Sequence, residues 1–188
     1  DAALARRQSR EIGHAALHGR AVRIDGFNLI LTVEPALGGG VVLACRDGSY
    51  RDLASVHGTY RKVAETRPAL ELAAKHFAEW GLGPCRWLLD APVSNSGSLA
   101  ALIREVNADW IAEVVPDPDA VLIQPGDLIA TADSMILDHC DEWVSLARLR
   151  RIVARTNALG ADIILILGDL EAGHRFVTKK VSMEDTAA

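Results

Sequence analysis

Apolar runs alternate along the chain with segments of helical spacing, which predicts short buried strands separated by helices. Strand-length apolar runs lie at 21–25, 85–90, 111–116, 127–133, 143–146 and 161–168. Apolar residues at helical spacing predict helices at 28–37, 66–80, 96–110, 135–140 and 147–159. Such alternation is typical of a mainly parallel sheet covered on both faces, so we expect an α/β protein, a three-layer α/β/α sandwich.

Two segments near the N-terminus depart from this alternation. Residues 2–18 predict a helix that ends at Gly19, ahead of the first strand. Residues 41–53 carry Asp47 and Gly48 between two extended runs, a strong signal for an inserted β-hairpin. The resulting division is an N-terminal helix at 1–20, one domain at 21–175 and a polar tail at 176–188.

Three of the predicted strands end in the same way, with an aspartate followed by a small residue. These residues are Asp25, Asp90 and Asp133. The carboxyl ends of parallel strands meet at one edge of a sheet, where ligands of such sheets bind. Each aspartate alone is also explained as a turn former or a helix cap. Three at equivalent strand ends favour a joint acidic site.

Carboxylates gathered at one edge would repel one another unless a cation neutralised them. Oxygen ligands without cysteine suit Mg²⁺ or Mn²⁺, so we expect one of these ions as cofactor. Asp25, Asp90 and Asp133 are the expected ligands, with Asp138, one turn beyond Ser134, as a further ligand. Asn28 offers an amide that can orient a carboxylate, a water or a phosphate.

The segment 56–62, with the sequence VHGTYRK, follows the predicted hairpin and is a candidate for substrate contacts. Arg61 and Lys62 would contact phosphates, Tyr60 would stack on a base, and His57 would donate to a phosphate or shuttle a proton. The alternative is structural, with His57 satisfied by the backbone and Tyr60 packed on the core. Ser134, beside Asp133, is both a helix cap and a substrate-binding candidate.

The composition of the 188 residues narrows the class of protein. A net charge of -5 and a pI near 5.7 argue against a broad basic surface for nucleic acid, although not against a local grip on phosphates through a metal. Cys45, Cys85 and Cys140 form no CxxC pair, which argues against a disulfide framework or structural zinc and fits a reducing cytoplasm. No apolar run reaches the roughly 18 residues of a membrane span.

Four segments of the chain resemble the prokaryotic domain-of-unknown-function family 434. They are IDGFNLILTVEPALGGG, RDLASVHGTYRK, WLLDAPVSNSG and ATADSMILD, and the likeness runs from about 22 to about 153. The C-terminal region of that family is classed among PIN-like domains, and its members carry a further N-terminal helical region. Because the chain begins at Asp1 without a methionine, we expect it to be a truncated form with 1–19 as the remnant of that region.

The resemblance implies a parallel α/β/α sandwich and, in active members, a metal-dependent ribonuclease site of clustered acids. It places the acid of the first strand at Asp25, with Asn28 in the DGxN form of the related NYN group. It places the TxD motif at Thr131 and Asp133, and a mid-sheet acid at Asp90. Many PIN domains take another acid from a central helix, and the candidates for it here are Glu65, Glu71 and Asp119.

The leading prediction is a Mg²⁺- or Mn²⁺-dependent nuclease that acts on RNA, with nucleic acid as partner and no membrane. A homodimer is left open. The alternative is a catalytically inactive PIN-like module that binds RNA or protein. A Toprim-like phosphoryl-transfer enzyme using Asp117 and Asp119 ranks below both, because that fold takes a glutamate after its first strand. The segment 117–124 that contains these two residues is ambiguous between helix and strand.

Overall fold

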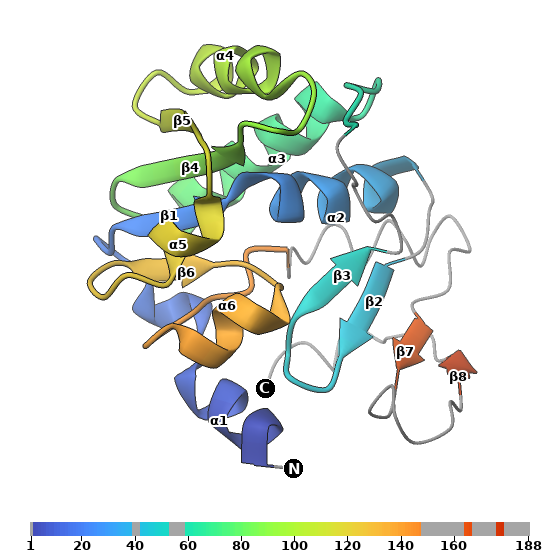
Figure 1. The fold of residues 1–188 in the computed structure, drawn as a ribbon, viewed down its shortest axis with the longest axis vertical. Helices are drawn as coiled ribbons and strands as arrows, with labels where there is room; N and C mark the ends of the chain where they lie inside the picture. The colour runs from blue at the N-terminus through green and yellow to red at the C-terminus, as the bar shows by residue number, and fades with distance from the viewer. Residues whose placement is uncertain (1, 39–41, 53–58, 148–163, 167–175, 179–188) are drawn as a thin grey trace.

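A parallel sheet forms the centre of the protein in the computed structural model, which describes residues 2–38, 42–52, 59–147, 164–166 and 176–178 (Figure 1). Its four strands are β1 (Val22–Asp25), β4 (Cys85–Asp90), β5 (Ile111–Val115) and β6 (Leu128–Ala130). They lie in the order β5-β4-β1-β6, and every neighbouring pair is parallel. The predicted α/β class with a mainly parallel central sheet is confirmed.

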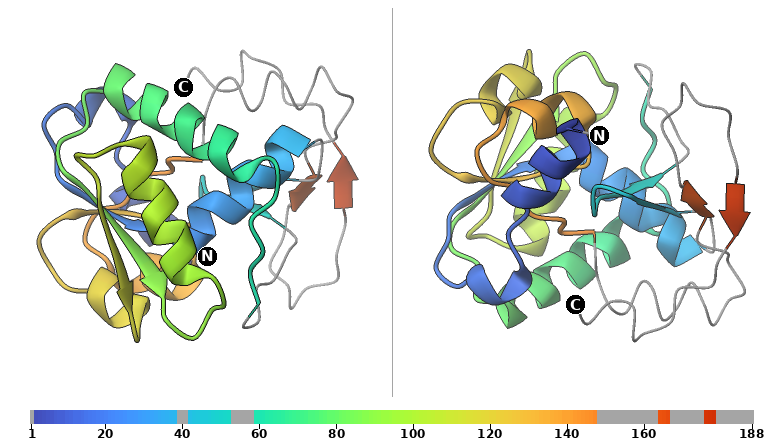
Figure 2. Two further views of the ribbon diagram at one scale, coloured as in Figure 1. Left: turned by 90° about the horizontal axis from the view of Figure 1, so that it is seen from above. Right: turned by 90° about the horizontal axis from the view of Figure 1, so that it is seen from below.

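Helices pack on both faces of this sheet (Figures 1 and 2). The first face carries α2 (Gly26–Gly38), α3 (Thr66–Glu79) and α4 (Ser96–Val106), and the second carries α5 (Pro118–Leu122) and α6 (Ser134–His139). Alternate residues of β4 point to opposite sides: Trp87 and Leu89 lie in the core under α2 to α4, and Leu88 lies in the core with α5 and α6. The sheet is therefore the middle of three layers.

Successive strands are added first on one side of β1 and then on the other. From β1 it moves to β4 and then to β5, and it returns afterwards to place β6 on the other side of β1. In open parallel sheets this reversal leaves a crevice at the carboxyl ends of the strands, and ligands bind there. The switch point of this sheet lies between the ends of β1 and β6.

The predicted hairpin is present and belongs to a second, smaller sheet. Strands β2 (Val42–Cys45) and β3 (Tyr50–Asp52) are antiparallel, and Gly48 in the turn between them has a φ of +92°. The segment 161–168 was expected in the central sheet, but β7 (Ile164–Ile166) pairs with β2 instead. The tail expected at 176–188 begins with strand β8 (Phe176–Thr178), because its backbone pairs with β7.

The outer side of β6 is occupied by the chain around Trp143, which explains why β7 does not lie there. Ile129 donates its backbone N–H to Glu142 and accepts one from Val144 on its carbonyl. The strand expected at 143–146 is thereby reduced to an isolated bridge at Trp143. The helix expected at 147–159 lies outside the described residues, apart from Ala147.

The N-terminal segment forms two short pieces instead of the one helix expected at 2–18. Helix α1 (Ala2–Arg10) ends where the backbone turns to Trp143, and one 3-10 turn follows at His14–Ala16. The Trp143 N–H donates to the Arg10 carbonyl, and the Ile12 N–H donates to the Trp143 carbonyl at 2.7 Å. These bonds to a neighbouring segment replace helical ones, so the helix stops. Helix α1 packs against α6.

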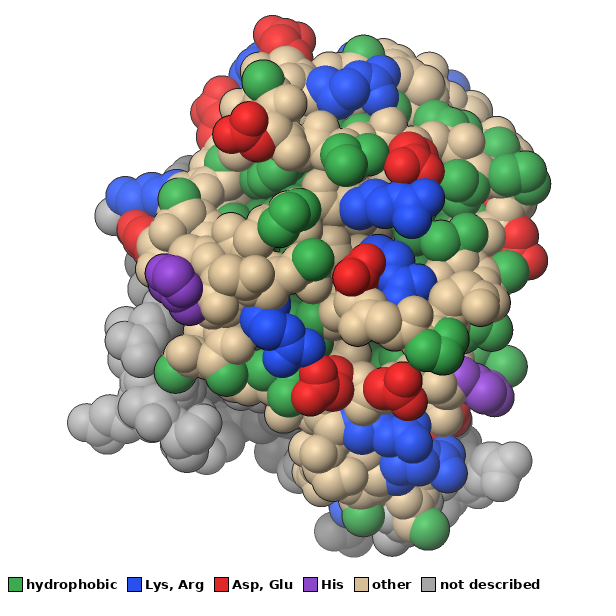
Figure 3. All heavy atoms as spheres, turned by 90° about the vertical axis from the view of Figure 1, so that its left-hand side faces the viewer, with side chains coloured by type: hydrophobic (Ala, Val, Ile, Leu, Met, Phe, Trp, Pro, Cys, Tyr) green, Lys and Arg blue, Asp and Glu red, His purple; other side chains and the backbone are tan. Residues whose placement is uncertain are grey.

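Charged groups of both signs are mixed on the surface of the protein. On the face drawn in Figure 3, Lys and Arg side chains alternate with acidic and hydrophobic ones. Several half-buried arginines have acidic partners, such as Arg86 with Glu113 and Arg20 with Glu142. No helix in the described part of the chain has the length and apolar character needed to cross a membrane.

Gly26 is required where β1 passes directly into α2. A Cβ at this position would lie 2.5 Å from Leu89 Cδ2 and 3.0 Å from the Leu88 carbonyl oxygen. Leu89 is fully buried, so neither neighbour can move without disturbing the core. We expect Gly26→Ala to lower the free energy of unfolding by about 1–3 kcal/mol, as overpacking does. Urea denaturation would measure this change, and an unchanged or higher stability would contradict the close approach.

Candidate acidic site

Asp25 ends β1 at the switch point of the sheet, and its carboxylate is held by two neighbours. Thr131, just after β6, donates its hydroxyl to Asp25 Oδ2 at 2.8 Å. The backbone N–H of Asn28, in the first turn of α2, donates to Asp25 Oδ1 at 3.3 Å. The side chain is partly buried and has a fixed orientation.

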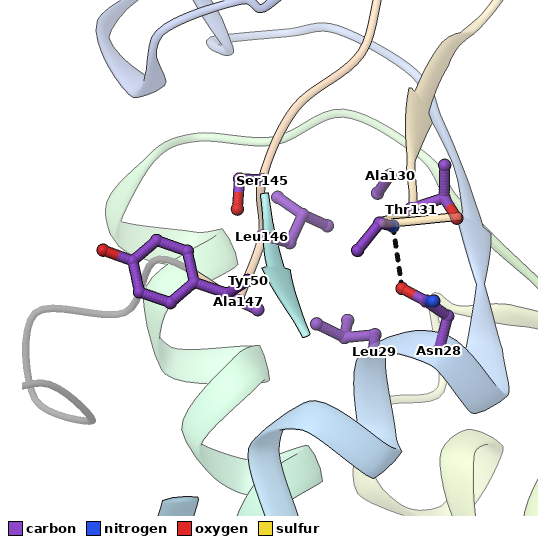
Figure 4. Close-up of a pocket in the computed structure, with 9 residues that line it drawn as sticks. Asn28, Leu29, Tyr50, Ala130, Thr131, Ser145, Leu146 and Ala147 are labelled. Carbon is purple, nitrogen blue, oxygen red and sulfur yellow. Dashed lines mark hydrogen bonds between the residues drawn. The ribbon is translucent and has the colours of Figure 1, made fainter. Parts of the chain in front are cut away.

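The segment after β6 is tied to the start of α2 by the Asn28 side chain. Asn28 Oδ1 accepts the backbone N–H of Ala132 at 2.8 Å, as the dashed line in Figure 4 shows. The Asp133 N–H donates to the Thr131 hydroxyl at 3.0 Å. Asn28 and Thr131 thus fix the position of Asp133 relative to Asp25.

Asp133, and not Ser134, caps the helix that follows. Asp133 Oδ1 accepts the backbone N–H of Met135 at 2.7 Å. The Ser134 hydroxyl instead accepts a hydrogen bond from Arg51 Nη1 at 3.0 Å. The cap predicted at Ser134 therefore belongs one residue earlier, because the longer carboxylate side chain reaches the free N–H groups of the first turn.

Asp90 and Asp119 complete the acidic edge. Asp90 ends β4, the strand beside β1, and Asp119 lies in the first turn of α5. The negative charge of Asp119 acts on Asp25, and the charges of Asp90 and Asp133 act on Asp119. The three strand-end aspartates predicted from the sequence are accordingly joined by a fourth acid.

Burial and mutual repulsion shift the pKa values of two of these groups. Burial raises the pKa of Asp25 from 3.8 to about 7; the hydrogen bonds from Thr131 and Asn28 lower it, and the charges of Asp119 and Asp133 raise it further. The pKa of Asp119 is also raised, by burial first and then by Asp133, Asp117 and Asp90. A cation bound between these carboxylates would reverse both shifts.

The acids are near enough to repel one another but are not gathered around one point. Among the described residues, no three side chains of His, Cys, Asp or Glu lie close enough together to hold a metal ion. A metal bound by one or two of these side chains would need water molecules as further ligands. Mg²⁺ sites in proteins keep several waters and use one or two carboxylates.

A small hollow lies between this site and the second sheet. Asn28 of α2 and the residues Thr131 and Ala132 after β6 line it on one side, and Tyr50 of β3 and Leu146 line it on the other (Figure 4). The hairpin therefore reaches the carboxyl edge of the central sheet at the end of β6. Nothing in the hydrophobic pattern of the sequence predicted this approach.

Tyr60 is a core residue and is not available for stacking on a base. Its side chain is 2% exposed, its ring meets Phe27 edge-on, and its hydroxyl donates to Glu34 Oε1 at 2.6 Å. The structure therefore supports the alternative in which Tyr60 packs on the core. Its hydrogen-bond partner, Glu34 of α2, is a buried carboxylate.

Arg61 and Lys62 are exposed beside the loop that follows Asp90. The backbone of Tyr60 fixes their place: its N–H donates to the Ser94 hydroxyl at 3.1 Å, and its carbonyl accepts from Asn95 Nδ2 at 2.7 Å. Both basic side chains remain candidates for phosphate contacts at the β4 end of the acidic edge. His57 lies outside the described residues.

Asp138 belongs to a structural ion pair. Both of its carboxylate oxygens accept hydrogen bonds from Arg7 of α1, each at 2.8 Å, and Arg6 adds a third at 3.3 Å. These arginines hold the pKa of Asp138 at about 2. We therefore remove Asp138 from the expected ligand set, because its oxygens are already used to attach α1 to α6.

Two of the three candidates for the further acid from a central helix lie away from the acidic edge. Glu71 is exposed and lies 4.0 Å from Arg67 on the same helix. Glu65 lies near Gly38 at the far end of α2, a helix of 13 residues that begins at the acidic edge. A helix of that length spans about 20 Å. Asp119 is the candidate that the structure brings to the edge.

We expect Asp138→Asn to separate the structural role of Asp138 from a role in metal binding. The change removes the charge that Arg6 and Arg7 share, so the free energy of unfolding should fall by about 1–2 kcal/mol. Affinity for Mn²⁺, measured by calorimetry, should remain that of the wild type. A loss of Mn²⁺ affinity without a loss of stability would return Asp138 to the ligand set.

Comparison with known proteins shows relatives of unknown function. An uncharacterized protein of Methanocaldococcus jannaschii, MJ0935, is 32% identical over 123 residues, which are 63% of this chain and 58% of that protein. The chain thus spans a little under three fifths of that relative's length. No solved structure gave a significant match.

A family match covers most of the chain. Residues 14–149 match the family described as Domain of unknown function (DUF5616), and all of the acids at the edge of the sheet lie within that range. The expectation of a family of unknown function is confirmed, and the family that matches is the one numbered 5616. This chain is a member of the DUF5616 family.

Proposed function

We propose that this domain is a PIN-like, metal-dependent nuclease that hydrolyses phosphodiester bonds of RNA at the acidic edge of its central sheet. The observation that carries the proposal is Asp25, whose carboxyl group has a pKa raised to about 7 at the switch point of the sheet. Burial of a carboxylate beside two others costs stability. Carboxyl groups with strongly shifted pKa values are common in functional sites.

The residues present fit a hard divalent cation. All the candidate ligands are carboxylates, which Mg²⁺ and Mn²⁺ prefer, and no cysteine or histidine stands among them. The largest charge effects on Asp25 come from Asp119 and Asp133, and both are repulsive. Asp25, Asp133, Asp119 and Asp90 would hold the ion.

The chemistry follows from this donor set. When bound, Mg²⁺ or Mn²⁺ lowers the pKa of a water and neutralises charge on a phosphate. Thr131 and the Asn28 N–H keep the Asp25 carboxylate oriented, and the Asn28 amide keeps Ala132, and hence Asp133, in place. Groups that hold ligands in this way raise metal affinity, commonly by 10- to 100-fold. Arg61 and Lys62, exposed beside the loop that follows Asp90, are available for substrate phosphates.

RNA is the proposed substrate because the motifs of this sequence resemble those of PIN-like domains. The mixed surface and the net charge of -5 fit a protein that contacts a few phosphates locally, and not one that covers a long stretch of nucleic acid. Such binding should be weak in the absence of a metal, since the acidic edge repels phosphate.

The direct test is cleavage of labelled single-stranded RNA and of DNA with the same sequence, in Mn²⁺, in Mg²⁺ and in EDTA. We expect cleavage of RNA in Mn²⁺ and none in EDTA. Protein with Asp25→Asn, purified in the same way, controls for contaminating ribonuclease. If neither nucleic acid is cleaved in either metal, the proposal of an active nuclease is wrong.

A second candidate function is a non-catalytic PIN-like module that binds RNA or protein. The observation that favours it is the lack, among the described side chains, of three acids arranged to hold one ion. This alternative predicts binding of RNA that Mn²⁺ does not strengthen and that Asp25→Asn leaves unchanged. Fluorescence anisotropy with and without Mn²⁺ distinguishes it from the nuclease.

A further inference from the structure

Arg51 is a basic residue that the structure brings to the β6 end of the acidic edge. It lies on β3, and its Nη1 donates to the hydroxyl of Ser134 at 3.0 Å. Ser134 directly follows Asp133 in the sequence. The neighbouring Tyr50 lines the hollow beside Asn28 and Thr131. Two independent contacts thus place β3 at this corner of the site.

The guanidinium of Arg51 is held in a fixed orientation by the hairpin turn. Its Nε donates to the Ser49 hydroxyl at 3.2 Å, and its Nη2 donates to Asp47 Oδ2 at 3.1 Å. Both partners are buried, and Asp47 Oδ1 accepts the hydroxyl and the N–H of Ser49 at 2.6 and 3.1 Å. Asp47, Ser49 and Arg51 are therefore joined by hydrogen bonds within the hairpin, and these bonds fix the guanidinium.

These hydrogen bonds leave some N–H groups of Arg51 without a role in the hairpin. A guanidinium has five N–H groups, and the bonds to Ser49, Asp47 and Ser134 use three of them. Asp47 also pairs with Arg7, so one carboxylate is shared between two cations. The Arg51 side chain is 31% exposed, which leaves it open to a ligand.

We propose that Arg51 binds a backbone phosphate of the nucleic acid next to Asp133. A guanidinium held in place fits the oxygens of a phosphate, and it is ordered before the ligand arrives. Arg51 lies at the β6 end of the row of acids, and Arg61 and Lys62 lie at the β4 end. A single strand would then cross the carboxyl ends of β4, β1 and β6, with a cation holding it at each end. This inference rests on the proposed function.

The alternative is that Arg51 only attaches the hairpin to α6. The two roles differ in what they do to the salt dependence of binding. A phosphate contact contributes to the slope of log K against log salt, by about 0.7 for single strands. A purely structural arginine would alter thermal stability and leave this slope unchanged.

The test is the affinity of the full chain for a fluorescein-labelled single-stranded oligouridylate, with Ca²⁺ in place of Mn²⁺, over a series of KCl concentrations. We expect Arg51→Gln to weaken binding by about tenfold and to lower the slope by about 0.7. Arg51→Lys should keep the slope and lose part of the affinity, because lysine cannot form the same fork. Arg86→Gln is the matched control, since Arg86 is paired with Glu113 at the other edge of the sheet.

The outcomes of this experiment distinguish a phosphate-binding Arg51 from a structural one. If the wild type binds and Arg51→Gln binds equally well with an unchanged slope, the role of Arg51 is structural and the inference is wrong, while the proposed function stands. If thermal denaturation shows that Arg51→Gln is misfolded, the affinity of Arg51→Lys decides: an affinity equal to that of the wild type overturns the inference, because lysine cannot form the same fork with a phosphate. If the wild type binds no oligonucleotide at all, the proposed function fails, and this inference fails with it.

Discussion

Asp25→Asn is expected to reduce Mn²⁺-dependent cleavage of RNA by on the order of 10³-fold or more, without unfolding the protein. Asparagine has nearly the same shape as aspartate and keeps an oxygen that can accept from Thr131, so the local structure should persist. What it lacks is the negative charge at the centre of the acidic edge. The measurement is the single-turnover rate of cleavage, with the circular dichroism spectrum as a check on folding.

Two further variants make this test specific to the site. Asp119→Asn should also slow cleavage, because Asp119 is one of the acids proposed to hold the ion. Asp109→Asn is the matched control: Asp109 is exposed in the loop before β5, at the opposite edge of the sheet, and should leave the rate unchanged. Equal rates for the wild type and Asp25→Asn would rule out a catalytic role for Asp25.

The strand-end acids could be predicted because their positions depend only on local pattern and on a general property of parallel sheets. An apolar run that ends at Asp25 or Asp133 places the carboxylate at the carboxyl edge once the strands are known to be parallel. Thr131 was placed in the site by the TxD motif of the resemblance to PIN-like domains. The backbone dictates these positions directly, whatever the surrounding side chains are.

Residues whose role depends on distant partners could not be assigned in this way. The helical position of Asp138 suggested that it faced the site, but Arg7, 131 residues away in the sequence, takes its carboxylate. Tyr60 pairs with Glu34 on α2 by the same kind of long-range contact. Arg51 reaches the site because the hairpin packs against it, and no spacing in the sequence encodes that packing.

The position of Asp119 depended on an element that the sequence left open. The segment 117–124 fits a helix or a strand, and only a helix places Asp119 in the first turn beside the sheet edge. In the structure the Asp117 side chain accepts the Ala120 N–H at 3.0 Å and caps this helix. The cap residue and Pro118 at the first position are the signals that favour the helix.

Without metal, the wild-type protein should lose stability as the pH rises from 5 to 8, and Asp25→Asn should lose less. The pKa of Asp25 is about 7 in the folded protein against an ordinary value of 3.8, so the folded state holds this proton more tightly. A group of this kind favours folding fully at pH values below 3.8, and the contribution disappears as the pH rises through about 7. Asparagine does not titrate, so this part of the pH dependence vanishes in the variant.

The expected difference is up to about 3 kcal/mol between pH 5 and 8, and smaller where water reaches the side chain. Urea denaturation of both proteins in EDTA measures it, and the comparison cancels the titration of groups that they share, including Asp119. Mn²⁺ at pH 8 should restore stability to the wild type more than to the variant, because a ligand that binds only the folded state stabilises it by mass action. Parallel pH profiles for the two proteins would show that Asp25 has an ordinary pKa, and the acidic edge would then have no need of a cation.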